Sequence, residues 1–257
     1  MGRLITETAA PDQMSYMDRA AGIAVGLDYK QRFFADLDVR PGQAALDIGC
    51  GPGTDLGRLA DAVGAEGSVV GIDREPRMLD EARRRLSDRP NVELRSGDID
   101  ALPLAEDSVD RARVDRVLQH VLDPVRALAE VRRVLRPGGL FGMAEPDWDS
   151  LAVADEDIGT TRAFADFVAG RVRNPTMGRD LVRLCVHAGL RVKSVDPIAV
   201  LFRDFETADQ ILGLRRNAGR AVLAGKLAEE DAEAWVRRLA CGPVVAGFTF
   251  YLVVAQL

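Results

Sequence analysis

Three glycines at residues 49, 51 and 53 have the spacing that most clearly suggests chemistry. They lie in the decapeptide LDIGCGPGTD at residues 46–55, between an apolar run that ends at Ile48 and a helix-competent stretch, TDLGRLADAV. Glycine accepts the tight dihedral angles of such a strand-to-helix turn, and the free N–H groups of the helix start point outward. The turn is therefore predicted to lie at the carboxyl end of a parallel strand and to let a nucleotide-like ligand approach the backbone.

The glycine positions and a nearby carboxylate decide which ligand fits. A dinucleotide fingerprint, G-x-G-x-x-G, would need glycine at residue 54, where this chain has Thr54. Asp47 lies at the strand end, where its carboxylate would repel a pyrophosphate but attract a cation. Here the chain resembles the class I S-adenosylmethionine (SAM) dependent methyltransferases, whose first motif reads x-D-x-G-x-G-x-G and whose cofactor carries an ammonium and a sulfonium.

Later segments extend the resemblance. Residues 68–73 form a second buried strand, a helix begins at Pro76, and a third strand, VELRS, leads to GDIDALP. Residues 109–124 resemble the family's fourth strand and loop, and residues 133–141 resemble the helix, turn and fifth strand that follow. Five segments in order are hard to obtain by accident. The chain is therefore identified as a member of this family, of the type that methylates small molecules, natural products or quinones.

The resemblance implies how SAM and its demethylated product, S-adenosyl-L-homocysteine, are held. Asp73 is expected to reach the ribose hydroxyls, Asp98 to accept from the adenine amine, and Ile99 to lie against the ring. Cys50 has no evident base beside it, so we expect a small filler residue rather than a nucleophile. The expected cofactor contacts are Asp47, Gly49, Cys50, Gly51, Gly53, Thr54, Asp55, Asp73, Arg74, Met78, Gly97, Asp98, Ile99, Asp115 and Tyr16.

The alternation of apolar runs and helical patterns predicts an α/β fold. Helices near residues 54–63, 76–86 and 124–135 separate the runs, which implies right-handed crossovers and a doubly wound, mostly parallel, Rossmann-like sheet. The resemblance makes the final run, FTFYLVVAQL, an antiparallel strand beside a strand in RVKSVDPIAVLF, for seven strands in all. The five earlier strands are expected near residues 44–48, 69–73, 92–96, 110–114 and 140–144.

Three kinds of region are expected along the chain. Residues 1–40 should form helices that close over the cofactor. Helical patterns in the later insertions predict a cap over the carboxyl end of the sheet, with substrate beneath it. The expected core is residues 41–145, 186–202 and 245–257, and the expected helical cap is residues 146–185 and 203–244.

Composition excludes several classes of partner. With 257 residues, 47% apolar, the chain can bury a substantial core. A formal charge of -6 argues against nucleic acid. No apolar stretch suggests a signal peptide or membrane span, so we expect no membrane partner and a cytoplasmic location. The cysteines at 50, 185 and 241 show no paired metal spacing, so no metal is expected, and a homodimer is compatible with the sequence.

His120 and Glu145 are the candidate catalytic residues. His120 follows the fourth strand, at a position that matches a histidine near the methyl group in related natural-product and quinone methyltransferases. It could remove a proton from the acceptor, or it could hydrogen-bond its own loop. Glu145 ends the fifth strand and could orient an amine or hydroxyl, or could accept from local N–H groups. His187, on the apolar side of LVRLCVHAGL, has no visible partner, which favours a structural role.

Three residues after the fifth strand are candidates for acceptor binding. Trp148 could form a wall of the acceptor pocket or pack within the cap. Arg173 and Arg179 lie in RNPTMGRD, and Arg179 stands at a helix start, where its charge opposes the helix dipole. Arg179 could bind an anionic substrate group, or it could pair with a nearby acid of residues 155–157.

The fourth strand departs from the expected composition. A parallel strand should be nearly all apolar, yet this one reads DRARVD and places Arg111 and Arg113 on one face. Asp115 and Arg116 lie close in sequence, so a buried polar network below the site and a frayed strand edge are both compatible with the pattern.

The sequence thus predicts a SAM-dependent methyltransferase acting by in-line displacement on a small molecule, such as a bacterial secondary metabolite. A methyltransferase of protein or RNA is a second interpretation, which the acidic balance and the helical cap disfavour. A SAM-binding protein without catalysis is a third, because the acids at 47, 73 and 98 indicate binding rather than turnover.

Overall fold

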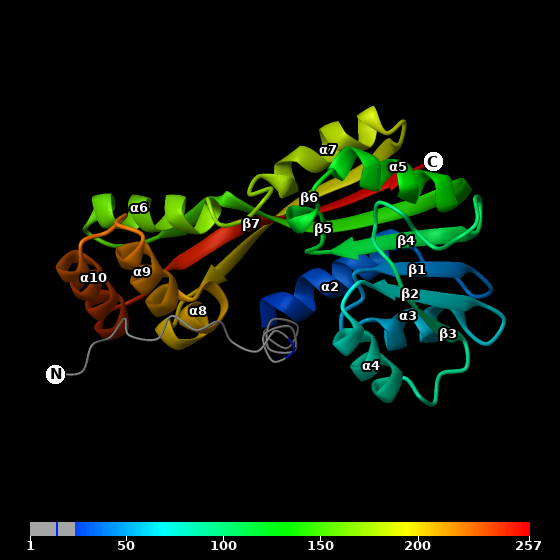
Figure 1. The fold of residues 1–257 in the computed structure, drawn as a ribbon, viewed down its shortest axis with the longest axis horizontal. Helices are drawn as coiled ribbons and strands as arrows, with labels where there is room; N and C mark the ends of the chain where they lie inside the picture. The colour runs from blue at the N-terminus through cyan, green and yellow to red at the C-terminus, as the bar shows by residue number, and fades with distance from the viewer. Residues whose placement is uncertain (1–13, 15–23) are drawn as a thin grey trace.

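One seven-stranded sheet runs through the whole molecule. The computed structural model describes residue 14 and residues 24–257 (Figure 1). The strand order is β3-β2-β1-β4-β5-β7-β6, in which β1 to β5 pair in parallel and β7 pairs antiparallel with β5 and β6. This order confirms the predicted doubly wound sheet with an antiparallel closing strand. The strands are β1 (Ala44–Ile48), β2 (Ser68–Asp73), β3 (Val92–Ser96), β4 (Val109–Asp115), β5 (Leu135–Val153), β6 (Arg191–Phe202) and β7 (Ala246–Gln256).

Helices cover both faces of the sheet. In Figure 1, α5 and α7 lie on one face, and α2, α3 and α4 lie on the other. Sequence signals place the helix starts, because Pro76 opens α4 and the Asp123 side chain accepts the Arg126 N–H at the start of α5. The helices are α2 (Ala24–Leu37), α3 (Leu56–Val63), α4 (Pro76–Arg85), the 3-10 turn η1 (Leu118–His120), α5 (Pro124–Val134), α6 (Ile158–Ala169), α7 (Met177–His187), α8 (Phe205–Leu212), α9 (Leu214–Leu223) and α10 (Glu229–Cys241).

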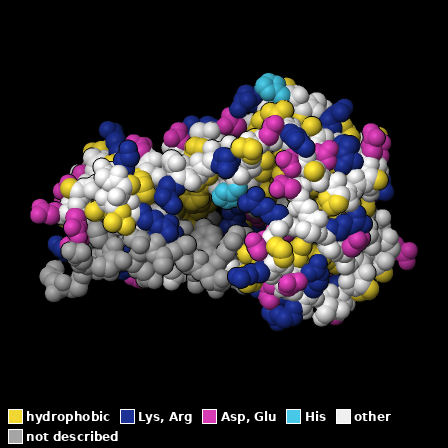
Figure 2. All heavy atoms as spheres, viewed as in Figure 1, with side chains coloured by type: hydrophobic (Ala, Val, Ile, Leu, Met, Phe, Trp, Pro, Cys, Tyr) yellow, Lys and Arg dark blue, Asp and Glu magenta, His cyan; other side chains and the backbone are white. Residues whose placement is uncertain are grey.

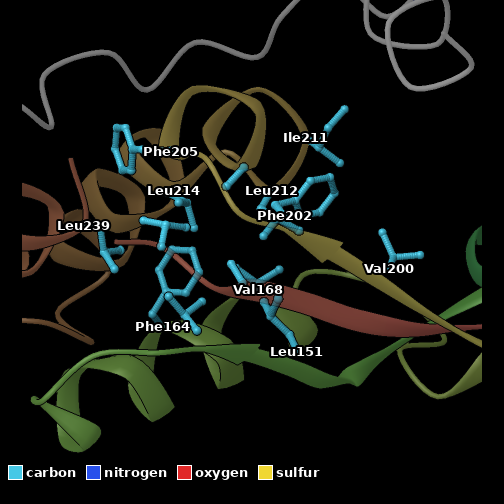
Figure 3. Close-up of a cluster of buried hydrophobic side chains, with 14 of the residues drawn as sticks. Leu151, Phe164, Val168, Val200, Phe202, Phe205, Ile211, Leu212, Leu214 and Leu239 are labelled. Atoms are coloured by element: carbon cyan, nitrogen blue, oxygen red, sulfur yellow. The ribbon is translucent and has the colours of Figure 1, made fainter. Parts of the chain in front are cut away.

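The helices α6, α8, α9 and α10, here called the helical lobe, pack around extended ends of β5, β6 and β7. Because β5 runs from the core into the lobe, the lobe lies on the carboxyl side of the parallel strands (Figure 1). Its interior is apolar, with Phe164, Leu214 and Leu239 pointing toward one another in Figure 3. The rings of Phe164 and Trp235 lie 4.7 Å apart. The lobe therefore has an apolar interior built on strands shared with the sheet and continuous with the buried residues under α2.

Residues 146–185 were expected to form part of a helical cap, and the structure differs at both ends of this range. Residues 146–153 continue β5, where Asp147 pairs with Thr249 and Ala152 pairs with Gly247 of β7. At the other end, α7 packs on the sheet beside α5 and shares the hydrophobic core of the parallel strands. A cap of α6 and of the helices after residue 203 remains. In the described part of the chain, no helix combines the length and apolarity that crossing a bilayer requires.

Candidate cofactor and acceptor site

A cavity of about 620 Å³ opens at the carboxyl ends of β1, β2 and β4. Figure 2 shows the surface hollowed between the sheet and the helical lobe, with hydrophobic and basic side chains around the hollow. The cavity is lined by Lys30, Asp47, Ile48, Gly49, Cys50, Gly51, Pro52, Thr54, Asp55, Asp73, Arg74, Gly97, Asp98, Ile99, Asp100, Arg113, Asp115, Arg116, Val117, Gln119, His120, Val121, Leu122, Trp148, Val172 and Arg173.

The glycine loop turns sharply at the rim of this cavity. Gly49, Gly51 and Gly53 have φ angles of 69°, 53° and 78°, a region that residues with a side chain rarely adopt. A Cβ atom at Gly49 would also collide with the Val117 side chain. The loop is held at β2, since the Gly51 N–H donates to Asp73 Oδ2 at 2.8 Å. The turn is thus both glycine-dependent and fixed, as a backbone cradle for a ligand must be.

One end of the cavity carries the acids expected at the adenosine. Asp73 ends β2 and also accepts the Glu75 N–H at 2.9 Å, so both of its oxygens are oriented by backbone donors. Asp98 and Ile99 follow β3 on the neighbouring side, and Ile99 is buried. Each carboxylate oxygen has a second lone pair for a ligand hydroxyl or amine. These residues fit an adenosine between the ends of β2 and β3.

Not every expected cofactor residue reaches the cavity. Gly53 and Met78 are absent from its lining: a Cβ at Gly53 would meet Ala82 and Leu86, and Met78 is buried in α4. Tyr16 lies outside the described residues. The expected contacts at 53 and 78 stay predictions, and Gly53 is the position where the glycine loop packs closely against α4.

A charged network lies under the other end of the cavity, and Arg113 is at its centre. The Arg113 side chain is 1% exposed, with Nη1 2.9 Å from Asp55 and 3.5 Å from Asp47 and with Nη2 3.1 Å from Asp115. The Lys30 ammonium donates to both oxygens of Asp55, at 2.8 and 2.6 Å. This arrangement confirms the buried network predicted for the fourth strand at Arg113, and β4 pairs on both sides rather than fraying.

Burial and charge act in opposite directions on the pKa values of these acids. Burial raises the pKa of Asp47 to about 7, although the Arg113 charge opposes the rise. Burial also acts on Asp55, but the charges of Arg113 and Lys30 outweigh it and lower the pKa of Asp55 to about 2. Asp55 is therefore the charged partner of the two cations at neutral pH. Asp47 is the acid whose protonation can change when a ligand binds.

The polar residues of β4 also hold helix α2 in place. The Tyr29 O–H donates to Asp115 at 3.0 Å, and the Arg111 Nε–H donates to the Leu37 carbonyl at 2.9 Å. Arg111 thus closes the carboxyl end of α2 instead of joining the network around Arg113. The Arg113 guanidinium also lies 5.1 Å from the Phe33 ring centroid. Sequence reasoning missed Lys30 and Tyr29, because no pattern in the helix itself marks its partner strand.

The loop after β4 is held from two sides. Glu145 is fully buried, and its carboxylate accepts the N–H groups of Val117, Leu118 and Gln119. Burial raises the pKa of Glu145 to about 8 despite these three bonds. Glu145 does not line the cavity, and its three bonds to the loop match the alternative expectation, that it accepts from local N–H groups. From the other side, Asn174 donates to the carbonyls of Leu118 and Val121.

His120 stands on this loop at the mouth of the cavity. Partial burial, and then the nearby charge of Arg74, lower the pKa of His120 from its usual value. A lowered pKa keeps the imidazole neutral at neutral pH, which is the form that can accept a proton. His187 is exposed at the end of α7 and is not part of the lining.

The acceptor candidates separate into two groups. Trp148 and Arg173 line the cavity, and the Trp148 indole N–H donates to Gln119 at 2.7 Å while its ring stacks on Phe248. Arg179 lies outside the lining and pairs with Asp147 and Asp149. The ion-pair alternative holds for Arg179, although the acids of residues 155–157 pair with Arg238 instead.

Comparison with known proteins agrees with this geometry. A family model described as a methyltransferase domain matches residues 40–178. Over 253 residues the chain is 51% identical to an uncharacterized 37.1 kDa protein in transposon TN4556 of Streptomyces fradiae, a match that covers 98% of this chain and 73% of that protein.

Methyltransferases of known name are more distant. A demethylmenaquinone methyltransferase of Staphylococcus aureus is 37% identical over 125 residues, which is 49% of this chain and about half, 52%, of that enzyme. The structure of a SAM-dependent methyltransferase from Mesorhizobium loti shares the fold, with 23% identity, a TM-score of 0.58 and coverage of 92% of this chain and 99% of that one. The match over most of the core, together with the fold and the glycine cradle, shows that this chain belongs to the class I SAM-dependent methyltransferase family.

Proposed function

We propose that this methyltransferase transfers the SAM methyl group to a small molecule bound at the outer end of the cavity, beside His120. The observation that carries the proposal is the continuity of the lining. A single cavity joins the glycine loop and Asp73 to His120 and Trp148. Its size of about 620 Å³ lies within the range of small-molecule sites, roughly 300–1,000 Å³.

The side chains at the outer end support an acceptor that is partly apolar and carries an anionic group. Trp148, Val172 and Leu122 offer apolar surface, and Arg173 offers a positive charge. A planar acceptor would gain contact with the Trp148 ring. The name of the Staphylococcus aureus relative, a demethylmenaquinone methyltransferase, is compatible with an aromatic acceptor. The formal charge of -6 and the enclosing lobe disfavour RNA or protein as acceptor.

Bound SAM supplies an activated methyl group, so the chain's own residues act mainly by position. Holding the acceptor atom in line with the methyl group can contribute about 7–11 kcal/mol to the rate. Glu145 and Asn174 fix the loop that carries His120. Neutral His120 then accepts the proton that an acceptor hydroxyl or amine loses as its bond to the methyl group forms.

A His120→Ala variant tests the proposed base. SAM affinity should stay near that of the parent, while turnover falls about 100-fold, the usual contribution of a positioned base. Turnover of the parent should also fall as the pH drops through the pKa of His120, below about 6.5 because the shift is downward. The measurement is the rate at which S-adenosyl-L-homocysteine forms. The acceptors supplied are hydroxylated aromatic acids and host metabolite fractions.

His187→Ala is the matched control, because His187 lies outside the cavity. It should leave both affinity and turnover unchanged. Parent-like turnover of His120→Ala would remove histidine from the mechanism, and SAM binding without turnover on any acceptor fraction would favour a SAM-binding protein without catalysis.

A further inference from the structure

We propose that Arg171, Arg216 and Arg220 of the helical lobe form a subsite for a phosphate or diphosphate group carried by the methyl acceptor. The proposal rests on the proposed function, which places the acceptor beside His120, and it names the class of acceptor. Its basis is the convergence of three guanidinium groups near the outer end of the cavity and a buried N–H group that lacks an acceptor.

Two segments of the lobe bring the three arginines together. Arg216 and Arg220 lie one turn apart on α9, so they share a face of that helix. Helix α9 packs beside α6, and Arg171 follows the end of α6 by two residues. The charges of Arg216 and Arg171 both act on Arg220, which places Arg220 within electrostatic reach of the other two. The lobe therefore carries a compact cluster of positive charge.

This arginine cluster is next to the outer end of the cavity. Val172 and Arg173 both line the cavity, and Arg171 immediately precedes them in the chain. Figure 2 shows basic side chains on the lobe side of the hollow. An acceptor that sits beside His120 and extends toward the lobe would therefore bring its far end to the cluster.

Arg216 occupies a position that is unfavourable without an anion. It stands in the first turn of α9, where a positive charge opposes the helix dipole. Its guanidinium lies against the junction of α8 and α9, since a Cβ atom at Gly213 would collide with Arg216 Nη2. The Nε of Arg216 is buried and has no hydrogen-bond partner among the residues that the structure describes. An oxygen of a bound anion would supply the missing acceptor.

The neighbouring arginine on α9 shows the contrast. Arg215 forms ion pairs with Glu206 and Asp209, at 3.0 and 2.7 Å. Within residues 24–257, neither Arg171 nor Arg216 forms an ion pair with an acid. Pairing with acids of the lobe therefore accounts for Arg215 and leaves the charges of the other two available to a ligand.

Clustered positive charge favours an anion with more than one negative charge. Burial, and then the charges of Arg216 and Arg171, lower the pKa of Arg220, which is the effect that like charges have on one another. A phosphate ester carries about 1.5–2 negative charges at neutral pH, whereas a carboxylate carries one. Guanidinium groups also match phosphate oxygens in planar, two-bond geometry. The cluster therefore suits a phosphate or diphosphate better than a single carboxylate.

Calorimetric titration of the full chain with inorganic diphosphate tests the subsite without any acceptor. The parent should bind diphosphate and should bind acetate much more weakly. Arg216→Gln removes the charge and the Nε donor, so it should weaken diphosphate binding about tenfold, the scale of a hydrogen bond to a charged group. Arg220→Gln should weaken it similarly, and circular dichroism should show that both variants are folded.

Arg215→Gln is the matched control. It removes the same charge from the same helix, but from a guanidinium already held by Glu206 and Asp209. It should leave the diphosphate affinity within about twofold of the parent's, as for a substitution away from the site. Equal losses in Arg215→Gln and Arg216→Gln would mean that the lobe attracts anions only by its net charge. That result, or a parent that does not bind diphosphate, would overturn the subsite.

Turnover measurements test whether the subsite serves the acceptor. A host metabolite fraction that supports methyl transfer should lose its activity after treatment with alkaline phosphatase. With the untreated fraction, Arg216→Gln should raise the apparent KM about tenfold with little change in kcat, because the cluster holds the acceptor away from the reacting atoms. Inorganic diphosphate should inhibit in competition with the acceptor.

Three results would overturn the acceptor assignment: an active fraction that phosphatase does not affect, an Arg216→Gln variant with the parent's KM, and inhibition by diphosphate that does not compete with the acceptor. Failure of the subsite and failure of the proposed function are distinguishable. Turnover without diphosphate binding overturns the subsite alone. Diphosphate binding at the cluster without turnover on any fraction overturns the proposed function and leaves an anion site on the lobe.

Discussion

Asp47 shows how one side chain can serve both the fold and the ligand. It is buried beside Arg113, and burial raises its pKa to about 7 against the pull of that charge. A carboxyl group with such a pKa is partly protonated at neutral pH, and a nearby cation shifts it toward the charged form. The cofactor brings that cation, since SAM carries an ammonium. We therefore expect Asp47 to couple cofactor binding to proton release.

This coupling predicts that SAM affinity rises with pH. Below pH 7 the Asp47 carboxyl must lose its proton before it can face the ammonium, so binding should tighten from pH 6 to pH 7.5 and release a proton. Titrations in buffers of different ionisation enthalpy measure both quantities. Asp47→Asn should bind SAM more weakly, with a flat profile over this interval, whereas a profile parallel to that of the parent would assign the pH dependence to another group.

At the level of elements, the loop after β4 is the part whose geometry the fold controls most closely. It carries His120, and three of its backbone N–H groups and two of its carbonyls are bonded by side chains of other elements. Glu145 of β5 accepts three of its N–H groups, and Asn174, just before α7, donates to two of its carbonyls. Buried groups without such partners would be costly. The position of the proposed base is therefore set by residues outside the cavity lining.

Asn174→Ala tests whether the position of this loop depends on bonds from outside it. Two loop carbonyls lose their donors, so we expect a loss of about 1–3 kcal/mol in the free energy of unfolding and a fall in kcat with little change in SAM affinity. Asn91→Ala is a matched control, because the Asn91 amide also donates to two carbonyls, those of Ala60 and Gly64, but at the end of α3. A similar stability loss in both variants with the same kcat would show that the loop does not depend on Asn174.

On the scale of the whole molecule, the helical lobe is continuous with the sheet. Strands β5, β6 and β7 pass from the core into the lobe without interruption (Figure 1). One buried cluster includes Phe33 of α2, Ala144 of β5 and Trp235 of α10, so the lobe and the cofactor side share apolar contacts. The two parts should therefore unfold together rather than one after the other.

Trp235→Ala tests that cooperativity. Trp235 is fully buried, and its removal should cost about 3–5 kcal/mol. For a chain of this size such a loss lowers Tm by roughly 6–20 °C. Calorimetry should show one transition that shifts as a whole, and SAM should still bind at 25 °C. Two transitions, of which only one moves, would instead mean that the lobe folds on its own.

The outline of the sheet could be predicted from local patterns, and its long-range features could not. Apolar runs bounded by glycine turns located β1 and β3 at residues 44–48 and 92–96, as observed. The extension of β5 beyond Glu145 was missed, because Pro146 and Asp147 resemble a turn. Their polarity is accommodated by distant partners: Asp147 pairs with Arg179, thirty-two residues later. A pairing between residues so far apart cannot be recognised from the sequence around either residue.

The candidate site divides in the same way. The glycine loop, Asp73 and Asp98 belong to compact motifs, so their places in the lining could be expected from the sequence. Lys30 could not be, because its role depends on which strand α2 crosses. The two arginines of β4 were the only indication in the sequence that other charged residues must pack here, because buried charges in a central strand require ionic or hydrogen-bonding partners.

That requirement makes the charged residues around β4 depend on one another. Arg113 is tolerable in a buried strand only with Asp47, Asp55 and Asp115 around it, and those acids in turn depend on cations. Replacing any one member by an apolar residue leaves a buried charge without its partner. Asp55, Arg113, Asp115 and the Tyr29–Lys30 pair thus form one interdependent unit of structure. The least strand-like stretch of the sheet therefore fastens α2 beside the cavity through charge.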